Sequence, residues 1–231
     1  MKFHPIIDNW FNEKFDGPTE VQQKAWPHIS QRSNVLLSAP TGSGKTLAAF
    51  LPGINQLLND SLHGNLSNET RILYISPLKA LSNDIRRNLE TPLTEINQSA
   101  TENDTFFHPL TVMLRTGDTT ARDRTKILKT PPHILVTTPE SLFLMLTAAK
   151  GRKVLETIET VIVDEIHSLA RDKRGSHMSL SLARLDRVCK KKPSRMGISA
   201  TQKPMSTIAE FLCGRTQQNL PSFANCEIID T

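Results

Sequence analysis

The sequence lacks any apolar run long enough to cross a lipid bilayer. A membrane-spanning helix needs about 20 consecutive apolar residues, and the apolar runs in these 231 residues are far shorter. The N-terminus, MKFHPIIDNWFNEKF, also lacks the apolar middle and small-residue cleavage site of a signal peptide. We therefore expect a cytoplasmic protein without a membrane partner.

Cysteine is also scarce. Cys189, Cys213 and Cys226 are odd in number, lie far apart, and have no histidines at the spacing of a zinc site. This predicts buried free thiols rather than a disulfide framework or a zinc centre. Internal repeats and low-complexity tracts are absent, and hydrophobic (38%) and charged (22%) residues stand at the levels of a soluble globular protein.

The charge balance is only mildly basic. Twenty-eight Lys and Arg residues against 23 Asp and Glu residues give a formal net charge of +5. A basic surface attracts phosphate polyanions at long range, but an excess this small does not by itself identify a nucleic-acid partner.

Short apolar runs alternate with helical patterns along most of the chain. Such runs are typical of strands buried on both faces, and their alternation with helices indicates crossover units and a parallel sheet. The sequence predicts one doubly wound α/β domain over 31–231, with a mostly parallel sheet and helices on both faces, after a helical lead-in over 1–30. Strands are expected at 35–39, 71–76, 110–114, 133–137, 160–164, 195–200 and 226–230, and polar surface loops at 59–70 and 91–109.

The segment APTGSGKT, directly after the first predicted strand, is typical of a phosphate-binding loop. Glycines allow backbone N–H groups to wrap an anion, and the following helix start adds favourable partial charge. Lys45 would reach the outer phosphates, and the Thr46 hydroxyl would bind Mg²⁺. Ala39 replaces the first glycine of the usual pattern. The residues assigned to this cradle are Thr41, Gly42, Ser43, Gly44, Lys45 and Thr46.

A pair of carboxylates follows another buried strand, in TVIVDEIH. Asp164 and Glu165 are expected at the carboxyl end of that strand, where α/β sheets bind ligands. Asp164 would hold Mg²⁺ through water, and Glu165 would polarise the water that attacks the nucleotide. Together with Lys45, this pair predicts the catalytic residues of a Mg²⁺-dependent nucleotide hydrolase.

Further motifs resemble those of the superfamily 2 DExH-box helicases, in the expected order over nearly the whole chain. They are PTEVQQKAW, SPLKAL, RTGDT, TTPESL, DEIH and SAT. The resemblance implies a RecA-like P-loop domain that hydrolyses ATP. It also implies that Gln22 reads the adenine edge. The residue that stacks on adenine is left open among Trp10, Phe11 and Phe15, whose alternative role is to form the apolar face of the lead-in helix.

The same resemblance implies contacts to the phosphates of a single strand of DNA or RNA, with DNA the expected strand. Each contact segment lies where a predicted strand ends and a helix begins, so local helix capping explains any one of them equally well. The implied contact residues are Pro77, Lys79, Arg115, Thr116, Gly117, Thr138 and Glu140. Ser199, Thr201 and His167 are implied to couple the γ-phosphate to the rest of the motor.

The ensemble of motifs is most similar to the large helicase-related (Lhr-type) group, which implies 3′ to 5′ translocation. Such motors close their ATP site with a second RecA-like domain of the same polypeptide, and its motifs do not follow SATQKP in this sequence. We therefore expect the chain alone to hydrolyse ATP hardly at all. Two alternatives stay open: a translocase that remodels complexes without unwinding, and a nucleotide-dependent nucleic-acid-binding module without catalysis.

Overall fold

The computed structural model describes residues 2–77, 86–103, 107–170, 173–201, 203–214 and 226–231. Seven strands form a single sheet in the order β3-β4-β2-β5-β6-β1-β7, and every neighbouring pair is parallel. All seven predicted strands are confirmed. Their bounds are β1 Val35–Ser38, β2 Ile72–Ile75, β3 Val112–Arg115, β4 Ile134–Thr137, β5 Thr160–Val163, β6 Ser194–Ser199 and β7 Glu227–Asp230.

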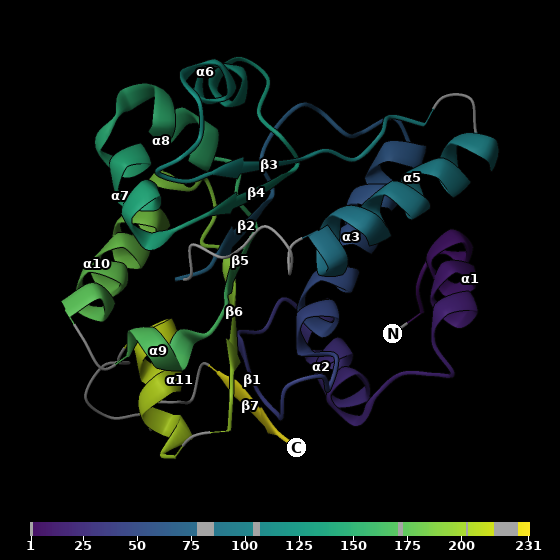
Figure 1. Ribbon diagram of the computed structural model, residues 1–231, viewed down its shortest axis with the longest axis horizontal. Coiled ribbons are helices and arrows are strands. Elements are labelled where there is room, and N and C mark those ends of the chain that lie inside the picture. The colour runs from purple at the N-terminus through teal and green to yellow at the C-terminus, as the bar shows by residue number, and fades with distance from the viewer. Residues whose placement is uncertain (1, 78–85, 104–106, 171–172, 202, 215–225) are drawn as a thin grey trace.

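Helices cover both faces of the sheet, which stands nearly edge-on in Figure 1. One side carries α1 Pro5–Lys14, α2 Glu20–Ser30, α3 Lys45–Leu62, the π-helical turn η1 Arg86–Glu90 and α5 Thr91–Asn103. The other carries α6 Ala121–Lys129, α7 Pro139–Thr147, α8 Ala149–Leu155, α9 Ile166–Leu169, α10 Lys173–Val188 and α11 Met205–Cys213. None of the helices in the described ranges is long and apolar enough to span a membrane.

Each strand contributes alternate side chains to two hydrophobic cores. In β1, Val35 and Leu37 enter the core beneath α1, α2, α3 and α5, whereas Leu36 enters the core on the other side. This alternation is the period of two expected of a strand buried on both faces. Helices α1 and α2 contribute to the first core together with the sheet, and the division of the chain at residue 30 stays a prediction.

The predicted loop over 91–109 is wrong for most of its length, because Thr91–Asn103 forms helix α5. Leu93, Ile96 and Ala100, together with Leu89 in η1, are buried against the first core. Their spacing of four, three and four residues is that of a helical stripe. The polar residues between these positions, such as Thr94, Gln98 and Thr101 on the exposed face, obscure this stripe in the composition, and it is the burial of the apolar face that stabilises the helix.

Replacing Ile96 with alanine should lower the free energy of unfolding by about 2–5 kcal/mol, because the side chain is fully buried and its removal leaves a cavity. Chemical denaturation monitored by circular dichroism measures the change. The matched control is Gln98→Ala on the exposed face of the same helix, which should change stability by less than about 0.5 kcal/mol. Equal effects of the two substitutions would contradict the placement of α5 in the core.

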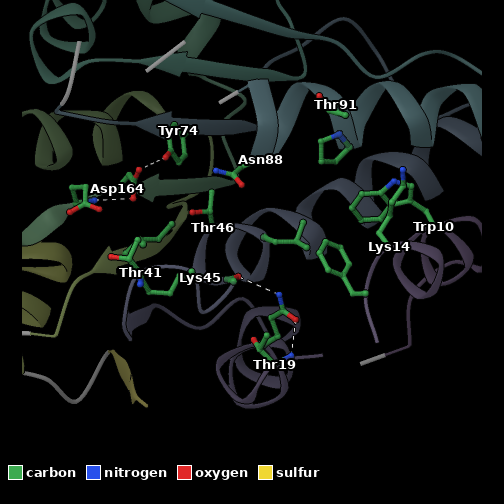
Figure 2. A pocket seen from close by; sticks show the side chains of 18 of the residues that line it. Trp10, Lys14, Thr19, Thr41, Lys45, Thr46, Tyr74, Asn88, Thr91 and Asp164 are labelled. Carbon is green, nitrogen blue, oxygen red and sulfur yellow. Dashed lines mark hydrogen bonds between the residues drawn. The ribbon is translucent and has the colours of Figure 1, made fainter. Parts of the chain in front are cut away.

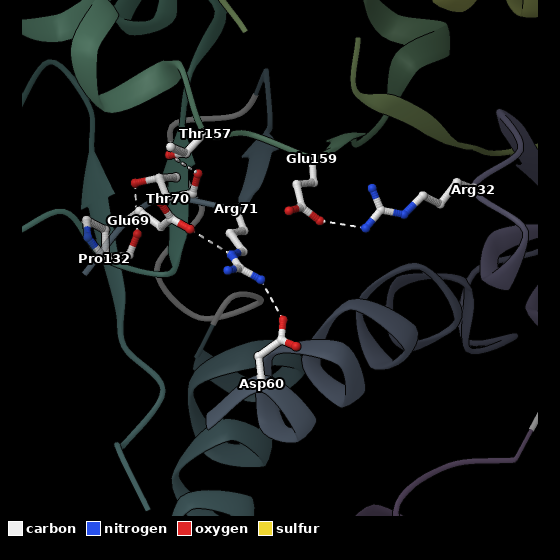
Figure 3. Close-up of polar contacts among 8 residues, drawn as sticks. All are labelled: Arg32, Asp60, Glu69, Thr70, Arg71, Pro132, Thr157 and Glu159. Carbon is white, nitrogen blue, oxygen red and sulfur yellow. Dashed lines mark hydrogen bonds and ion pairs between the residues drawn. The ribbon is translucent and has the colours of Figure 1, made fainter. Parts of the chain in front are cut away.

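Polar contacts tie the amino-terminal ends of the central strands together, at the edge of the sheet opposite to the motifs (Figure 3). Arg71, just before β2, forms ion pairs with Glu69 (3.0 Å) and with Asp60 of α3. Thr70 Oγ1 donates to the Pro132 carbonyl at 2.8 Å, and Thr157 Oγ1 donates to the Thr70 carbonyl at 2.9 Å. These contacts fix the segments that precede β2, β4 and β5, and leave the carboxyl edge for the motifs.

Candidate functional site

The order of the strands places the two groups of motifs side by side along one edge. The phosphate-loop segment follows β1 and the carboxylate pair follows β5, in the half of the sheet ordered β5-β6-β1. Ser76 and Pro77 of SPLKAL, and the segments RTGDT and TTPESL, lie at the ends of β2, β3 and β4, in the neighbouring half ordered β3-β4-β2. Strands β2 and β5 are paired, so the two halves meet at the centre of the sheet.

The loop between β1 and α3 has the backbone of an anion cradle. Gly42 and Gly44 adopt left-handed φ angles of 84° and 85°, which favour glycine. A Cβ at Gly44 would also lie only 2.6 Å from Gln22 Nε2. Ala39 is fully buried, and it is not among the residues with positive φ. The backbone at this position therefore does not require glycine, and alanine can replace the first glycine of the usual pattern.

Lys45 lies over this loop at the first position of α3. Its ammonium group donates to the carbonyl oxygens of Ala39 and, at 2.6 Å, of Pro40. Desolvation lowers the pKa of Lys45, and the carboxylates of Glu165 and Asp164 oppose that shift. The Ser43 hydroxyl oxygen is buried and has no hydrogen-bond partner within the described ranges. The loop thus holds a cation and a polar hydroxyl where a phosphate would enter.

The carboxylate pair is held rigidly at the end of β5. Asp164 accepts hydrogen bonds from the Tyr74 hydroxyl, on the adjacent strand β2, and from the Glu165 backbone N–H at 3.0 Å. Glu165 has a φ of 45°, in the left-handed region that residues other than glycine rarely adopt. Backbone strain of this kind concentrates at functional sites, because the surrounding structure must hold it.

His167 links this pair to the SAT segment after β6. Its Nδ1 accepts the Ala200 backbone N–H at 3.2 Å, and its Nε2 lies 3.3 Å from Glu165 Oε2. Because Nδ1 is an acceptor, Nε2 carries the proton, and this N–H is the group nearest the carboxylate. Ser199 is fully buried and its hydroxyl donates to the Ala200 carbonyl, whereas Thr201 is exposed. The structure brings His167 and the SAT backbone together, but among the described residues it records no hydrogen bond from Thr201 to this network.

One pocket of about 680 Å³ joins the phosphate loop to the carboxylate pair and continues toward α1 (Figure 2). Among the three candidate stacking residues, Trp10 and Phe11 are buried, and the Trp10 indole N–H donates to Glu95 of α5 at 2.7 Å. Phe15 is 42% exposed and lines the pocket. Of the three rings, that of Phe15 has the most surface available to a ligand.

Gln22 also lines this pocket, and its amide connects α2 to the phosphate loop. Its side chain is buried; Oε1 accepts the Thr19 N–H at 3.0 Å, and Nε2 donates to the Gly44 carbonyl at 3.3 Å. The amide therefore already contacts the loop that would hold the phosphates. Its role toward adenine stays a prediction.

The residues at the ends of β3 and β4 that are candidates for contact with a nucleic-acid strand also form local hydrogen bonds within the protein. The Thr138 hydroxyl accepts the Ser141 N–H at the start of α7, as a helix cap does. The Thr116 N–H donates to Thr119 Oγ1 at 2.8 Å. The Gly117 carbonyl accepts from Arg124 of α6 at 2.7 Å.

Two guanidinium groups lie close together near the end of β3. Desolvation and the nearby charge of Arg124 lower the pKa of Arg115, and the Arg115 side chain also donates to the Thr116 carbonyl at 3.3 Å. Like charges held at such proximity favour binding of an anion between or beside them.

The candidates at the ends of β2 and β4 are joined by a residue that the motifs did not single out. Arg174, in the first turn of α10, forms an ion pair with Glu140 (2.8 Å) and donates to the Pro77 carbonyl at 3.1 Å. Pro77 is buried, and Lys79 lies outside the described residues. Glu140 thus contacts a cation of the same chain.

Sequence reasoning missed Tyr74, Arg124 and Arg174. Tyr74 stands within the apolar run of a predicted strand, and its hydroxyl reaches Asp164 only because β2 and β5 are neighbours. Arg124 and Arg174 follow the motifs RTGDT and DEIH by a few residues, but their partners are distant in sequence or are backbone carbonyls. A pattern of residue types alone cannot reveal such contacts.

The residues present fit a magnesium ion bound to phosphate. Thr46 supplies a hydroxyl and Asp164 a carboxylate, and both line the same pocket as the phosphate loop. Mg²⁺ prefers such hard oxygen ligands, and it is commonly held by one or two protein oxygens, with phosphate and water completing its coordination.

A glycine-bearing loop at β1 and a carboxylate pair at β5, on one edge of a parallel sheet, define the class of P-loop nucleotide-binding domains. Residues 19–210 match the family described as DEAD/DEAH box helicase. The chain belongs to this family.

Particular relatives carry the Lhr name. The chain is 48% identical over 227 residues to an ATP-dependent helicase Lhr-Core of Methanothermobacter thermautotrophicus, covering 98% of the chain and 26% of that protein. It is 46% identical over 217 residues to the Lhr helicase/uracil glycosylase of Escherichia coli, covering 92% and 14%. The resemblance to the Lhr-type group is confirmed, and the chain spans only about 14 to 26% of these relatives.

A solved structure supports the same relationship. The helicase Lhr of Mycobacterium smegmatis, bound to ssDNA and AMP-PNP, aligns with a TM-score of 0.86 at 43% identity, over 99% of this chain and 28% of that one. A DEAD-box helicase, Mss116, aligns with a TM-score of 0.77 at 20% identity, over 99% of this chain and 43% of that one, and shows the fold alone. The RecA-like fold expected from the resemblance is confirmed.

Proposed function

We propose that this chain is the ATP-binding motor domain of a helicase or translocase that couples ATP hydrolysis to movement along single-stranded nucleic acid, with DNA as the first candidate. The observation that carries the proposal is the pairing of β2 with β5. The end of β5, with the carboxylate pair, is therefore next to the end of β2, and this supports a shared site for ATP and the nucleic-acid strand. The relative solved with ssDNA and AMP-PNP supports both ligand classes.

The residues of the pocket divide the work of hydrolysis. Lys45 and the loop N–H groups would bind the β- and γ-phosphates, and Glu165 would orient the attacking water. Mg²⁺, held by Thr46 and Asp164, would neutralise the phosphate oxygens. The close approach of His167 to Glu165, and the hydrogen bond from the Ala200 N–H to His167, would transmit the state of the γ-phosphate to the SAT segment.

Phe15 is the residue that we propose to stack on adenine. Its substitution by alanine should weaken ATP binding by about 1–3 kcal/mol, the range measured for aromatic–base stacking. Because stacking does not distinguish purines, GTP binding should weaken equally, whereas Gln22→Ala should reduce the preference for ATP. Titration with fluorescent nucleotides measures both effects.

Leu144→Ala, at an exposed apolar side chain away from the pocket, is the control for the Phe15 substitution. If Phe15→Ala leaves the affinity for ATP unchanged, stacking of Phe15 on adenine is excluded.

The partners that we propose are a nucleic-acid strand and a second RecA-like domain of the same polypeptide. The relatives are several times longer than this chain, which leaves room for such a domain in a complete polypeptide. A motor of this kind works where ATP and nucleic acid are both present, and we propose the cytoplasm.

The experiment that tests the proposal combines translocation and strand displacement by the complete polypeptide. Movement along single-stranded DNA that requires ATP is the expected result, and separation of a duplex would identify a helicase. Translocation without duplex separation would identify the remodelling translocase instead. ATP-independent binding without any movement would contradict the proposal and would favour the binding module.

A further inference from the structure

Arg174 lies where segments from three neighbouring strands converge. Its Nε donates to Glu140 Oε1 at 2.9 Å, its Nη2 lies 2.8 Å from the same oxygen in an ion pair, and Nη2 donates to the Pro77 carbonyl at 3.1 Å. Pro77 follows β2, and Glu140 opens α7 after β4. Arg174 itself opens α10, the next long helix after the carboxylate pair that ends β5. In the sheet, β4, β2 and β5 are consecutive neighbours.

The start of α10 packs tightly against α9, the short helix that follows the carboxylate pair. A Cβ at Gly175 would lie 1.9 Å from the Leu169 carbonyl oxygen, so only glycine permits this approach. Leu169 is the last residue of α9, and Glu165 is the residue that precedes that helix. A displacement of α9 would therefore also displace Arg174.

The contact is better placed to set geometry than to stabilise the fold. The side chains of Arg174 and Glu140 are 46% and 56% exposed, and ion pairs this exposed add little to stability. Although burial acts in the opposite direction, hydrogen bonds from the Glu140 backbone N–H and from Arg174 lower the pKa of Glu140. An ionised Glu140 would repel phosphate, so its interaction with Arg174 is what connects this residue to the strand-contact segments.

We propose that Arg174 is a positioning residue, which fixes the spacing of the segments after β2 and β4 through Glu140 and the Pro77 carbonyl, and which links that spacing to the carboxylate pair through the α9–α10 junction. This inference rests on the proposed function. As a consequence, Arg174 couples the bound nucleotide to the affinity for the nucleic-acid strand, although Arg174 does not contact the nucleic acid.

The test compares variants of the complete polypeptide by fluorescence anisotropy with labelled oligo(dT). Affinity is measured with a non-hydrolysable ATP analogue and with ADP, at several salt concentrations. In the unmodified protein the two nucleotides should give affinities that differ by about 5- to 150-fold, the usual range of such coupling. Arg174→Gln should reduce this ratio toward 1, and Arg174→Lys should do the same, because lysine lacks the planar fork that reaches two acceptors.

Glu140→Gln and the salt dependence distinguish positioning from direct contact. If Arg174 acts by positioning, Glu140→Gln weakens strand binding and no variant changes the dependence of affinity on salt. If Arg174 bound a phosphate directly, Glu140→Gln would strengthen binding, and Arg174→Gln would reduce the salt slope by about 0.7; either result overturns the proposal.

Arg187→Gln is the matched control, since it removes the same charge from an exposed position on the same helix. An Arg174→Gln variant that behaves like this control would also overturn the inference, while leaving the motor function intact. Failure of the proposed function is distinguishable, because the unmodified protein would then show no strand binding that depends on nucleotide.

Discussion

Replacing Glu165 with glutamine should lower ATP turnover by the complete polypeptide about 10²- to 10⁴-fold, the usual contribution of a general base. The amide has nearly the shape of the carboxylate but cannot accept a proton from the attacking water. Because Lys45 and the loop N–H groups are unchanged, ATP binding should persist. Steady-state hydrolysis and equilibrium titration with ATP measure the two quantities separately.

Glu159→Gln is the matched control for this substitution. Glu159 pairs with Arg32 at 2.8 Å at the opposite edge of the sheet, so its change should leave turnover nearly unaffected. A Glu165→Gln protein that keeps more than about a tenth of the original turnover would show that another group activates the water, and the assignment of Glu165 would be wrong.

Joining this chain to a second RecA-like domain should raise its ATP turnover about 10³- to 10⁵-fold over the chain alone, if that domain supplies an arginine finger. The described residues that line the pocket include the cations Lys14 and Lys45 but no arginine. Positive charge opposite Lys45 would stabilise the transferred phosphoryl group, and we propose that the second domain supplies it. Parallel hydrolysis assays of the isolated chain and the complete polypeptide measure the ratio.

The control for this comparison is Lys45→Ala in both proteins, which identifies any contaminating hydrolase. Turnover by the isolated chain within tenfold of the complete polypeptide would contradict the need for a second domain. Nucleotide binding by the isolated chain is expected in either case, since the phosphate loop is complete.

The strands could be predicted from the sequence because each is a short apolar run that the fold buries on both faces. Helix α5 could not be recognised by composition, since the segment as a whole is rich in Asn, Ser and Thr. The stripe formed by Leu93, Ile96 and Ala100 was present in the sequence, and a search for helical periodicity would have found it. In this segment the burial of a few apolar side chains outweighs the polar composition and stabilises a helix.

The parts of the site that are continuous in sequence could be predicted, and those formed by tertiary contact could not. The phosphate loop and the carboxylate pair each lie within a few residues, so local patterns identify them. The contacts of Tyr74 with Asp164 and of Arg174 with Pro77 depend on the order of the strands. That order is set by how the helices pack, which residue spacing does not record.

The most direct test of the central claim is ATP hydrolysis by the complete polypeptide, measured while single-stranded DNA is added. The proximity of the ATP site to the strand-contact segments predicts that DNA raises turnover to a plateau. It also predicts that the DNA concentration needed for half of that effect rises steeply with salt, as phosphate contacts require. Turnover that is the same with and without a nucleic-acid strand would contradict the claim that the two sites work as one motor.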